Sequence, residues 1–152
     1  MIHMKTIGYL GLGIMGYGMT SNLIDKSGTT VYGFDPVPAL RERFEQRGGK
    51  AVSNAEELYR TCDIIFMCLP TNAIVKATIT DIMNTARPGT IIVDMGSTSP
   101  YVIQELHTTA LEKGFHLLDP PSAAARLAPT AAAWSSCPAA NRRSLKRSSP
   151  IC

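Results

Sequence analysis

Three glycines near the start of the chain have the spacing of a phosphate-binding turn. Gly11, Gly13 and Gly16 follow a short apolar run and open a helix-like segment, in the order G-x-G-x-x-G. At these positions the first glycine permits a tight turn, the second lets the backbone approach a pyrophosphate, and the third lets the helix pack against the strand. The helix N-terminus offers unpaired N–H groups and a positive dipole end to phosphates. The predicted binding residues of this turn are Gly11, Leu12, Gly13, Ile14, Met15 and Gly16.

An acidic residue stands about 20 positions further on. Asp35 follows the β-branched and aromatic run Thr30–Phe34, so it is predicted at the end of a second strand. A carboxylate there can accept hydrogen bonds from ribose hydroxyls and repel a 2′-phosphate. The alternative is a turn or cap aspartate before Pro36. The pattern favours NAD, and the nearby Arg41 and Arg43 leave NADP possible.

The first 118 residues alternate between strand-like and helix-like segments, which is typical of an α/β protein. The expected strands are 4–10, 30–34, 50–52, 63–69, 90–94 and 115–118; the expected helices are 14–26, 38–47, 55–60, 72–86 and 100–113, with Asn54 and Ser99 as helix caps. This alternation predicts a doubly wound, parallel Rossmann-type sheet in the order 3-2-1-4-5-6.

Such a sheet binds its ligand where strands one and four diverge, outside their carboxyl ends. The loops expected at that place are 11–16, 69–72 and 96–99. Three separate parts of the sequence are therefore predicted to line one crevice.

Composition indicates an ordinary globular domain, with 45% hydrophobic and 18% charged residues. No apolar run is long enough to span a membrane and no signal peptide is evident, so we expect neither a membrane partner nor export. The four cysteines have no metal-ligand spacing with the three histidines, so no metal site is expected, and reduced thiols suit a cytoplasmic protein.

The chain changes composition near residue 120. From Pro121 onward there is no acidic residue, whereas five of the 15 basic side chains lie there. The segment is rich in Ala, Ser and Pro and has no sustained period. We therefore predict a dinucleotide-binding domain over 1–120 and a poorly ordered tail over 121–152. The basic excess of the tail does not indicate a nucleic-acid partner, because Trp134 is its only aromatic residue.

Several linked motifs resemble the β-hydroxyacid dehydrogenase family, which includes 3-hydroxyisobutyrate and 6-phosphogluconate dehydrogenases. They are GLGIMGYGM, FDPVP, DIIFMCLPTNAIV, IIVDMGSTSP and GFHLLDPP, and together they cover about four-fifths of the chain. The resemblance implies that Leu69, Pro70 and Asn72 line the dinucleotide. It also implies that Ser97 and Thr98 lie beside the nicotinamide, although the family has threonine where this chain has Ser97.

The resemblance breaks off at Pro121, where the family continues with a V-S-G-G substrate loop. A single-base shift in the codons for 121–125 can restore V-S-G-G, so we interpret the tail as a frameshift product; a natural extension is the alternative. The family's acid/base lysine lies beyond that loop, and the surroundings of Lys146 do not match its motif. No catalytic residue is therefore assigned within this chain.

The family's helical second domain, which usually supplies the dimer interface, is also not expected in this chain, so the oligomer of the intact relative should not be preserved. The expected function is the cofactor-binding part of an oxidoreductase acting on a small 3-hydroxy acid, inactive in this form. The alternatives are a binding module without catalysis, or another reductase on the same scaffold, such as an imine or glyoxylate reductase.

Overall fold

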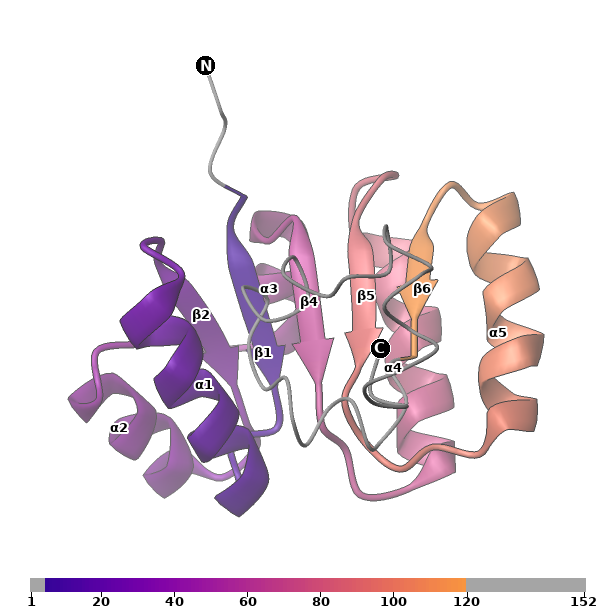
Figure 1. Cartoon of the computed structure of the whole chain (residues 1–152). Helices are drawn as coiled ribbons and strands as arrows, with labels where there is room; N and C mark the ends of the chain where they lie inside the picture. The colour runs from indigo at the N-terminus through magenta and orange to yellow at the C-terminus, as the bar shows by residue number, and fades with distance from the viewer. Residues whose placement is uncertain (1–4, 120–152) are drawn as a thin grey trace, which may run out of the picture.

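A computed structural model describes residues 5–119, and within them the chain forms a sheet flanked by helices (Figure 1). The strands are β1 (Ile7–Leu10), β2 (Val31–Phe34), β3 (Lys50–Ala51), β4 (Ile64–Met67), β5 (Ile91–Asp94) and β6 (His116–Leu118). The helices are α1 (Ile14–Lys26), α2 (Pro38–Gln46), α3 (Ala55–Thr61), α4 (Asn72–Thr85) and α5 (Pro100–Glu112).

The strands pair in the order β3-β2-β1-β4-β5-β6, and every pairing is parallel. The α/β Rossmann-type fold and the strand order predicted from the sequence are therefore confirmed. β1 lies between β2 and β4, so Leu10 is level with Phe34 on one side and with Met67 on the other. The chain reverses its direction of winding between β1 and β4, which leaves a crevice outside the carboxyl ends of these strands.

Two apolar layers hold the helices on the sheet. On one face, Phe44 of α2 and Leu23 of α1 pack with Tyr9 and Phe66. The rings of Tyr9 and Phe66 stack with their centroids 6.2 Å apart. On the other face α3, α4 and α5 pack around Ile65 and Ile92 of the central strands. Because both faces are covered at its centre, β4 is a continuous apolar run rather than an alternating one.

β3 begins at Lys50 as predicted, whereas β1 and β4 begin later than the sequence predicted, beside a side-chain network at the amino edge of the sheet. The Thr6 backbone N–H and hydroxyl both donate to Asp63 Oδ2 at 3.1 Å, and Arg87 donates to Asp63 Oδ1 at 3.2 Å. These three residues form the amino-edge clip. Because the Thr6 N–H bonds the Asp63 carboxylate instead of a strand partner, β1 begins at Ile7 and β4 at Ile64.

The helix caps agree with the sequence only in part. Asn54 caps α3 as predicted, accepting a hydrogen bond from the Glu57 N–H at 2.9 Å. Ser99 occupies the N-cap position of α5, but its side chain makes no capping bond, so the predicted cap is wrong in that respect. Thr71, which was not predicted as a cap, caps α4 through the Ile74 N–H.

The predicted domain boundary at 120 and the tail over 121–152 lie outside the described residues. Within residues 5–119, none of the helices combines the length and the apolar character needed to cross a bilayer.

Two glycines of α1 should respond in opposite ways to alanine. A Cβ at Gly16 would collide with the Gly11 carbonyl oxygen, whereas a Cβ at Gly18 would meet nothing within 4 Å. Gly16→Ala is expected to destabilise the fold by about 1–3 kcal/mol through overpacking. The matched control, Gly18→Ala on the exposed face, should stabilise the helix by about 0.5–1 kcal/mol. Urea denaturation measures both, and equal stabilities of the two variants would contradict this packing.

Candidate dinucleotide site

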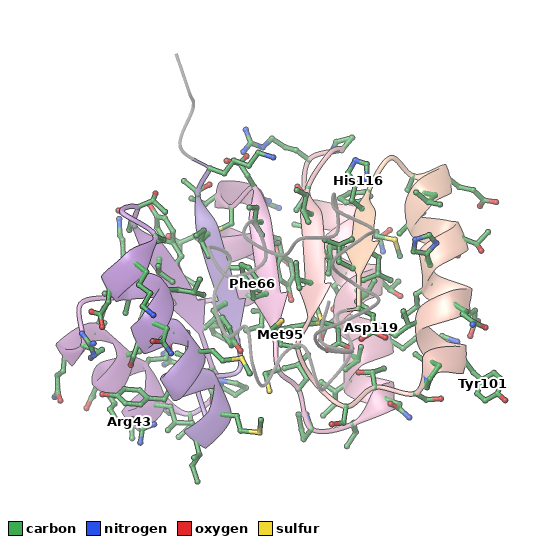
Figure 2. The ribbon with its side chains drawn as sticks, in the orientation of Figure 1. Arg43, Phe66, Met95, Tyr101, His116 and Asp119 are labelled. Atoms are coloured by element: carbon green, nitrogen blue, oxygen red, sulfur yellow. The ribbon has the colours of Figure 1, made fainter. Side chains whose placement is uncertain are left out.

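The loops predicted to meet at the carboxyl edge of the sheet line one crevice of about 770 Å³. The residue Met95, just past the end of β5, marks this edge in Figure 2. Eleven of the twelve predicted binding residues line the crevice: Gly11, Gly13, Ile14, Met15, Gly16, Asp35, Leu69, Pro70, Asn72, Ser97 and Thr98.

The glycine turn is shaped by close backbone contacts. Gly11 has φ +92°, and a Cβ there would also collide with the carbonyl oxygen of Cys68. The tight contact of Gly16 with the Gly11 carbonyl brings the start of α1 against the end of β1. Gly13 is different, because it lines the crevice and a Cβ there would meet no protein atom within 4 Å. The space beside Gly13 is therefore free for a ligand, and the glycines fit the roles predicted for them.

The start of α1 presents donors to this space. Gly13 is the N-cap residue of α1, and the helix has no side-chain cap. Its first-turn N–H groups therefore have no capping side chain to satisfy them, as a phosphate site at a helix N-terminus requires. Ile14 is 90% exposed and Met15 60% exposed at the mouth of the crevice.

Leu12 does not line the crevice, because its side chain is fully buried in the core. Its backbone N–H instead donates to Asp35 Oδ2 at 2.9 Å. This bond ties the glycine turn to the end of β2. Leu12, predicted as a binding residue, therefore lies outside the crevice lining and supports the turn through its backbone.

Asp35 makes the turn contact that the sequence left open and also lines the crevice, where its ribose role was predicted. Its Oδ1 accepts a hydrogen bond from the Val37 N–H at 2.9 Å, which is the turn role, while its Oδ2 accepts the Leu12 N–H. A carboxylate has about four lone-pair sites, so each oxygen keeps one for a ribose hydroxyl. Since Asp35 lines the crevice, this geometry is compatible with both roles at once.

The two nearby arginines point in different directions. Arg41 Nη1 donates to the Asp35 carbonyl oxygen at 2.7 Å, which keeps the guanidinium beside the predicted ribose site. Arg43 lies over the Tyr17 ring of α1, 4.0 Å from its centroid (Figure 2). Arg43 is therefore occupied by packing between α1 and α2, and Arg41 is the arginine next to Asp35.

A hydrogen bond joins the other two loops of the site. Asn72 Oδ1 accepts the Ser99 N–H at 3.1 Å, which links the start of α4 to the start of α5. The Asn72 side-chain amide N–H groups remain as donors on the crevice wall. Ser97 and Thr98 line the same crevice.

Further lining residues were not singled out from the sequence. They include Leu10, Phe34, Pro36, Ala55, Tyr59, Cys68, Ile74, Thr78 and Met95, whereas Thr71 and Gly96 lie in the loops 69–72 and 96–99 that were predicted. Most stand directly beside predicted residues, so extending each motif by one position would have found them. Tyr59 and Thr78 come from helices α3 and α4, and no sequence signal identified them.

Burial is the main cause of the raised pKa values of two side chains in the crevice wall, those of Tyr59 and Cys68. It raises the pKa of the Tyr59 phenol to about 12, with help from Asp81 and Glu56. Burial also raises the pKa of the Cys68 thiol, and Asp94 adds to the shift. At neutral pH neither group is poised to accept a proton as an anion would be.

No lysine, arginine or histidine is among the residues that line the crevice in the described part of the chain. Phosphates bound there would rely on backbone N–H groups and the α1 dipole. Over residues 5–119, no three His, Cys, Asp or Glu side chains come together as potential metal ligands.

A parallel sheet in this order, with a glycine turn and an acidic residue at its switch point, defines a dinucleotide-binding domain of the Rossmann class. Residues 6–152 match the model of the NAD binding domain of 6-phosphogluconate dehydrogenase. The chain belongs to this family, whose cofactor is a nicotinamide dinucleotide. Because the match runs to residue 152, the boundary near 120 stays a prediction.

Named relatives agree with the family. The chain is 32% identical over 148 residues to a probable 3-hydroxyisobutyrate dehydrogenase of Mycobacterium bovis, covering 97% of this chain and 50% of that protein. It is 37% identical over 118 residues to 2-(hydroxymethyl)glutarate dehydrogenase of Eubacterium barkeri, covering 76% of this chain and 39% of that protein. The chain thus spans half or less of the length of these relatives.

A solved structure supports the same conclusion. The 3-hydroxyisobutyrate dehydrogenase of Mycobacterium tuberculosis, solved with L-serine, superposes with a TM-score of 0.72 at 34% identity. The similarity covers 79% of this chain and 44% of that one. The fold and the class of cofactor are therefore established, while the individual site residues remain predictions.

The open space at Gly13 gives a direct test of the site. Gly13→Val should abolish dinucleotide binding, because the new side chain would occupy the space that the pyrophosphate needs. Gly18→Val is the matched control, since it makes the same change on the exposed face of the same helix. Calorimetric titration of both variants measures the effect. Unchanged affinity in Gly13→Val would remove the glycine turn from the site.

Proposed function

We propose that the crevice binds NAD in an extended conformation across the switch between β1 and β4. The turn 11–16 would hold the pyrophosphate, Asp35 the adenosine ribose, and the loops 69–72 and 96–99 the nicotinamide half. The observation that carries this proposal is the meeting of the open glycine turn, Asp35 and both loops in one crevice. When bound, the nicotinamide ring supplies hydride transfer, and the residues of this chain position it.

We propose further that the intact protein is an oxidoreductase acting on a small 3-hydroxy acid. The names of the relatives support this substrate class, and their greater length leaves room for the groups that handle the substrate. Within the described residues the crevice contains no lysine or histidine that could exchange a proton with a hydroxyl group. We therefore propose that the present chain binds cofactor without turnover, and that a one-base shift near Pro121 separates it from the active form.

Binding without catalysis as the biological role, in a stand-alone module, is the second candidate. The absence of lysine and histidine from the described crevice lining favours this candidate as well. The two candidates differ in what the repaired reading frame does, so one experiment separates them.

The preference for NAD or NADP depends on two charged side chains beside the predicted ribose position, those of Asp35 and Arg41. The chain should bind NAD more tightly than NADP by about tenfold or more, because the Asp35 carboxylate repels a 2′-phosphate. Arg41→Ala should weaken NADP further and leave NAD nearly unchanged, since Arg41 holds its charge beside Asp35. Arg43→Ala is the control and should not change the NAD to NADP ratio, because Arg43 packs on Tyr17. Fluorescence titration of the unmodified chain and the two variants measures the three NAD to NADP ratios, and equal or tighter NADP binding by the unmodified chain would refute the assignment.

Turnover is the second test. The 152-residue chain with NAD should oxidise 3-hydroxyisobutyrate at no measurable rate, because losing general acid/base catalysis alone costs about 10²–10⁴-fold. Adding one base at the Pro121 codon and expressing the longer frame should restore NADH formation, followed at its absorbance. The control is the repaired frame carrying Gly13→Val, which should stay inactive. Turnover by the 152-residue chain itself would overturn the proposed inactivity, and a repaired protein that binds NAD without turnover would favour the binding module.

A further inference from the structure

A buried carboxylate lies directly behind the crevice wall. Asp94 is the last residue of β5 and is fully buried. Its Oδ1 accepts the Gly96 N–H at 2.9 Å, whereas its Oδ2, equally buried, has no hydrogen-bond partner among the described residues. Since Gly96 lines the crevice, this carboxylate is separated from it by one layer of the wall.

The turn does not by itself account for a charged residue at this position. An asparagine would accept the Gly96 N–H equally well through its amide oxygen, without burying a charge. A buried carboxylate oxygen without a hydrogen-bond partner is costly, so the charge at this position calls for an explanation.

The charge of Asp94 reaches the groups that surround the same edge. It contributes to the raised pKa of the Cys68 thiol on the crevice wall and to that of the Asp119 carboxyl just past the end of β6, in each case after burial as the larger cause. Met95 and Asp119 lie at the same carboxyl edge of the sheet (Figure 2). Because the crevice lining has no cationic side chain among residues 5–119, no described lining group cancels this field.

The crevice therefore has a carboxylate near each of its two ends. Asp35 stands at the end of β2 and would face the adenosine ribose, and Asp94 stands at the end of β5, behind Met95, Gly96 and Ser97. In an extended dinucleotide the far end from the adenosine is the nicotinamide. That ring is positively charged when oxidised and neutral when reduced.

We propose that Asp94 makes the site select the oxidised cofactor, by stabilising the positive charge of the nicotinamide ring from behind the crevice wall. This inference rests on the proposed function, because it requires a dinucleotide bound with its nicotinamide at β5. It makes Asp94 a specificity-determining residue that acts through its charge and makes no contact with the adenosine half.

The test compares three ligands that differ only at the nicotinamide end: NAD⁺, NADH and ADP-ribose, which lacks the ring. The unmodified chain should bind NAD⁺ more tightly than NADH. In Asp94→Asn, which keeps the acceptor for the Gly96 N–H, the preference for NAD⁺ over NADH should fall by about tenfold. Affinity for ADP-ribose should stay the same. Calorimetry gives the dissociation constants without any need for turnover.

Glu112→Gln is the control, because it removes a negative charge from an exposed position on α5 outside the crevice, and its NAD⁺ to NADH ratio should equal that of the unmodified chain. An unchanged ratio in Asp94→Asn, or an equal loss for all three ligands, would overturn the inference. Tighter NADH than NAD⁺ binding by the unmodified chain would overturn it even if Asp94→Asn failed to fold. If the unmodified chain bound none of the three ligands, the proposed function itself would fail.

Discussion

The close approach of backbone to backbone around Gly11 is the constraint on which the rest of the site depends. Gly11 turns with a positive φ against the Cys68 carbonyl, and Gly16 contacts the Gly11 carbonyl in turn. No side chain fits at either point, so the end of β1, the end of β4 and the start of α1 are held at backbone distance. The direction of the α1 dipole, the opening beside Gly13 and the position of the Leu12 N–H all follow from this contact.

The sequence predicted most of the fold because local and long-range signals agree in it. The apolar run Ile64–Met67 is typical of a covered parallel strand. The turns after α1, α2, α4 and α5 each supply a glycine with positive φ, as at Gly28 and Gly114. The starts of β1 and β4 were not predictable from the sequence. The amino-edge clip joins Thr6 to Asp63 across 57 positions, and such a contact has no local pattern.

The site could be predicted where the backbone conformation requires a particular residue type. It could not be predicted where the packed structure determines which partner a side chain contacts. Gly13 and Asp35 follow from the shape of the turn and the end of β2. Arg41 contacts the Asp35 carbonyl oxygen, whereas Arg43 contacts the Tyr17 ring, and the sequence did not connect Tyr17 to either arginine. The lack of a donor to Asp94 Oδ2 could not be predicted from the sequence either, because only the packed structure shows which acceptors have no donor.

The amino-edge clip also bears on how this domain tolerates change. Thr6, Asp63 and Arg87 tie the sheet together at the edge opposite to the crevice, so part of the cohesion of the sheet comes from residues outside the predicted binding site. Substitutions in the loops 69–72 and 96–99 can therefore alter recognition while the strands stay anchored at their other ends. Ligand preference can then change through substitutions at the carboxyl edge of the sheet, without compensating substitutions at the amino edge.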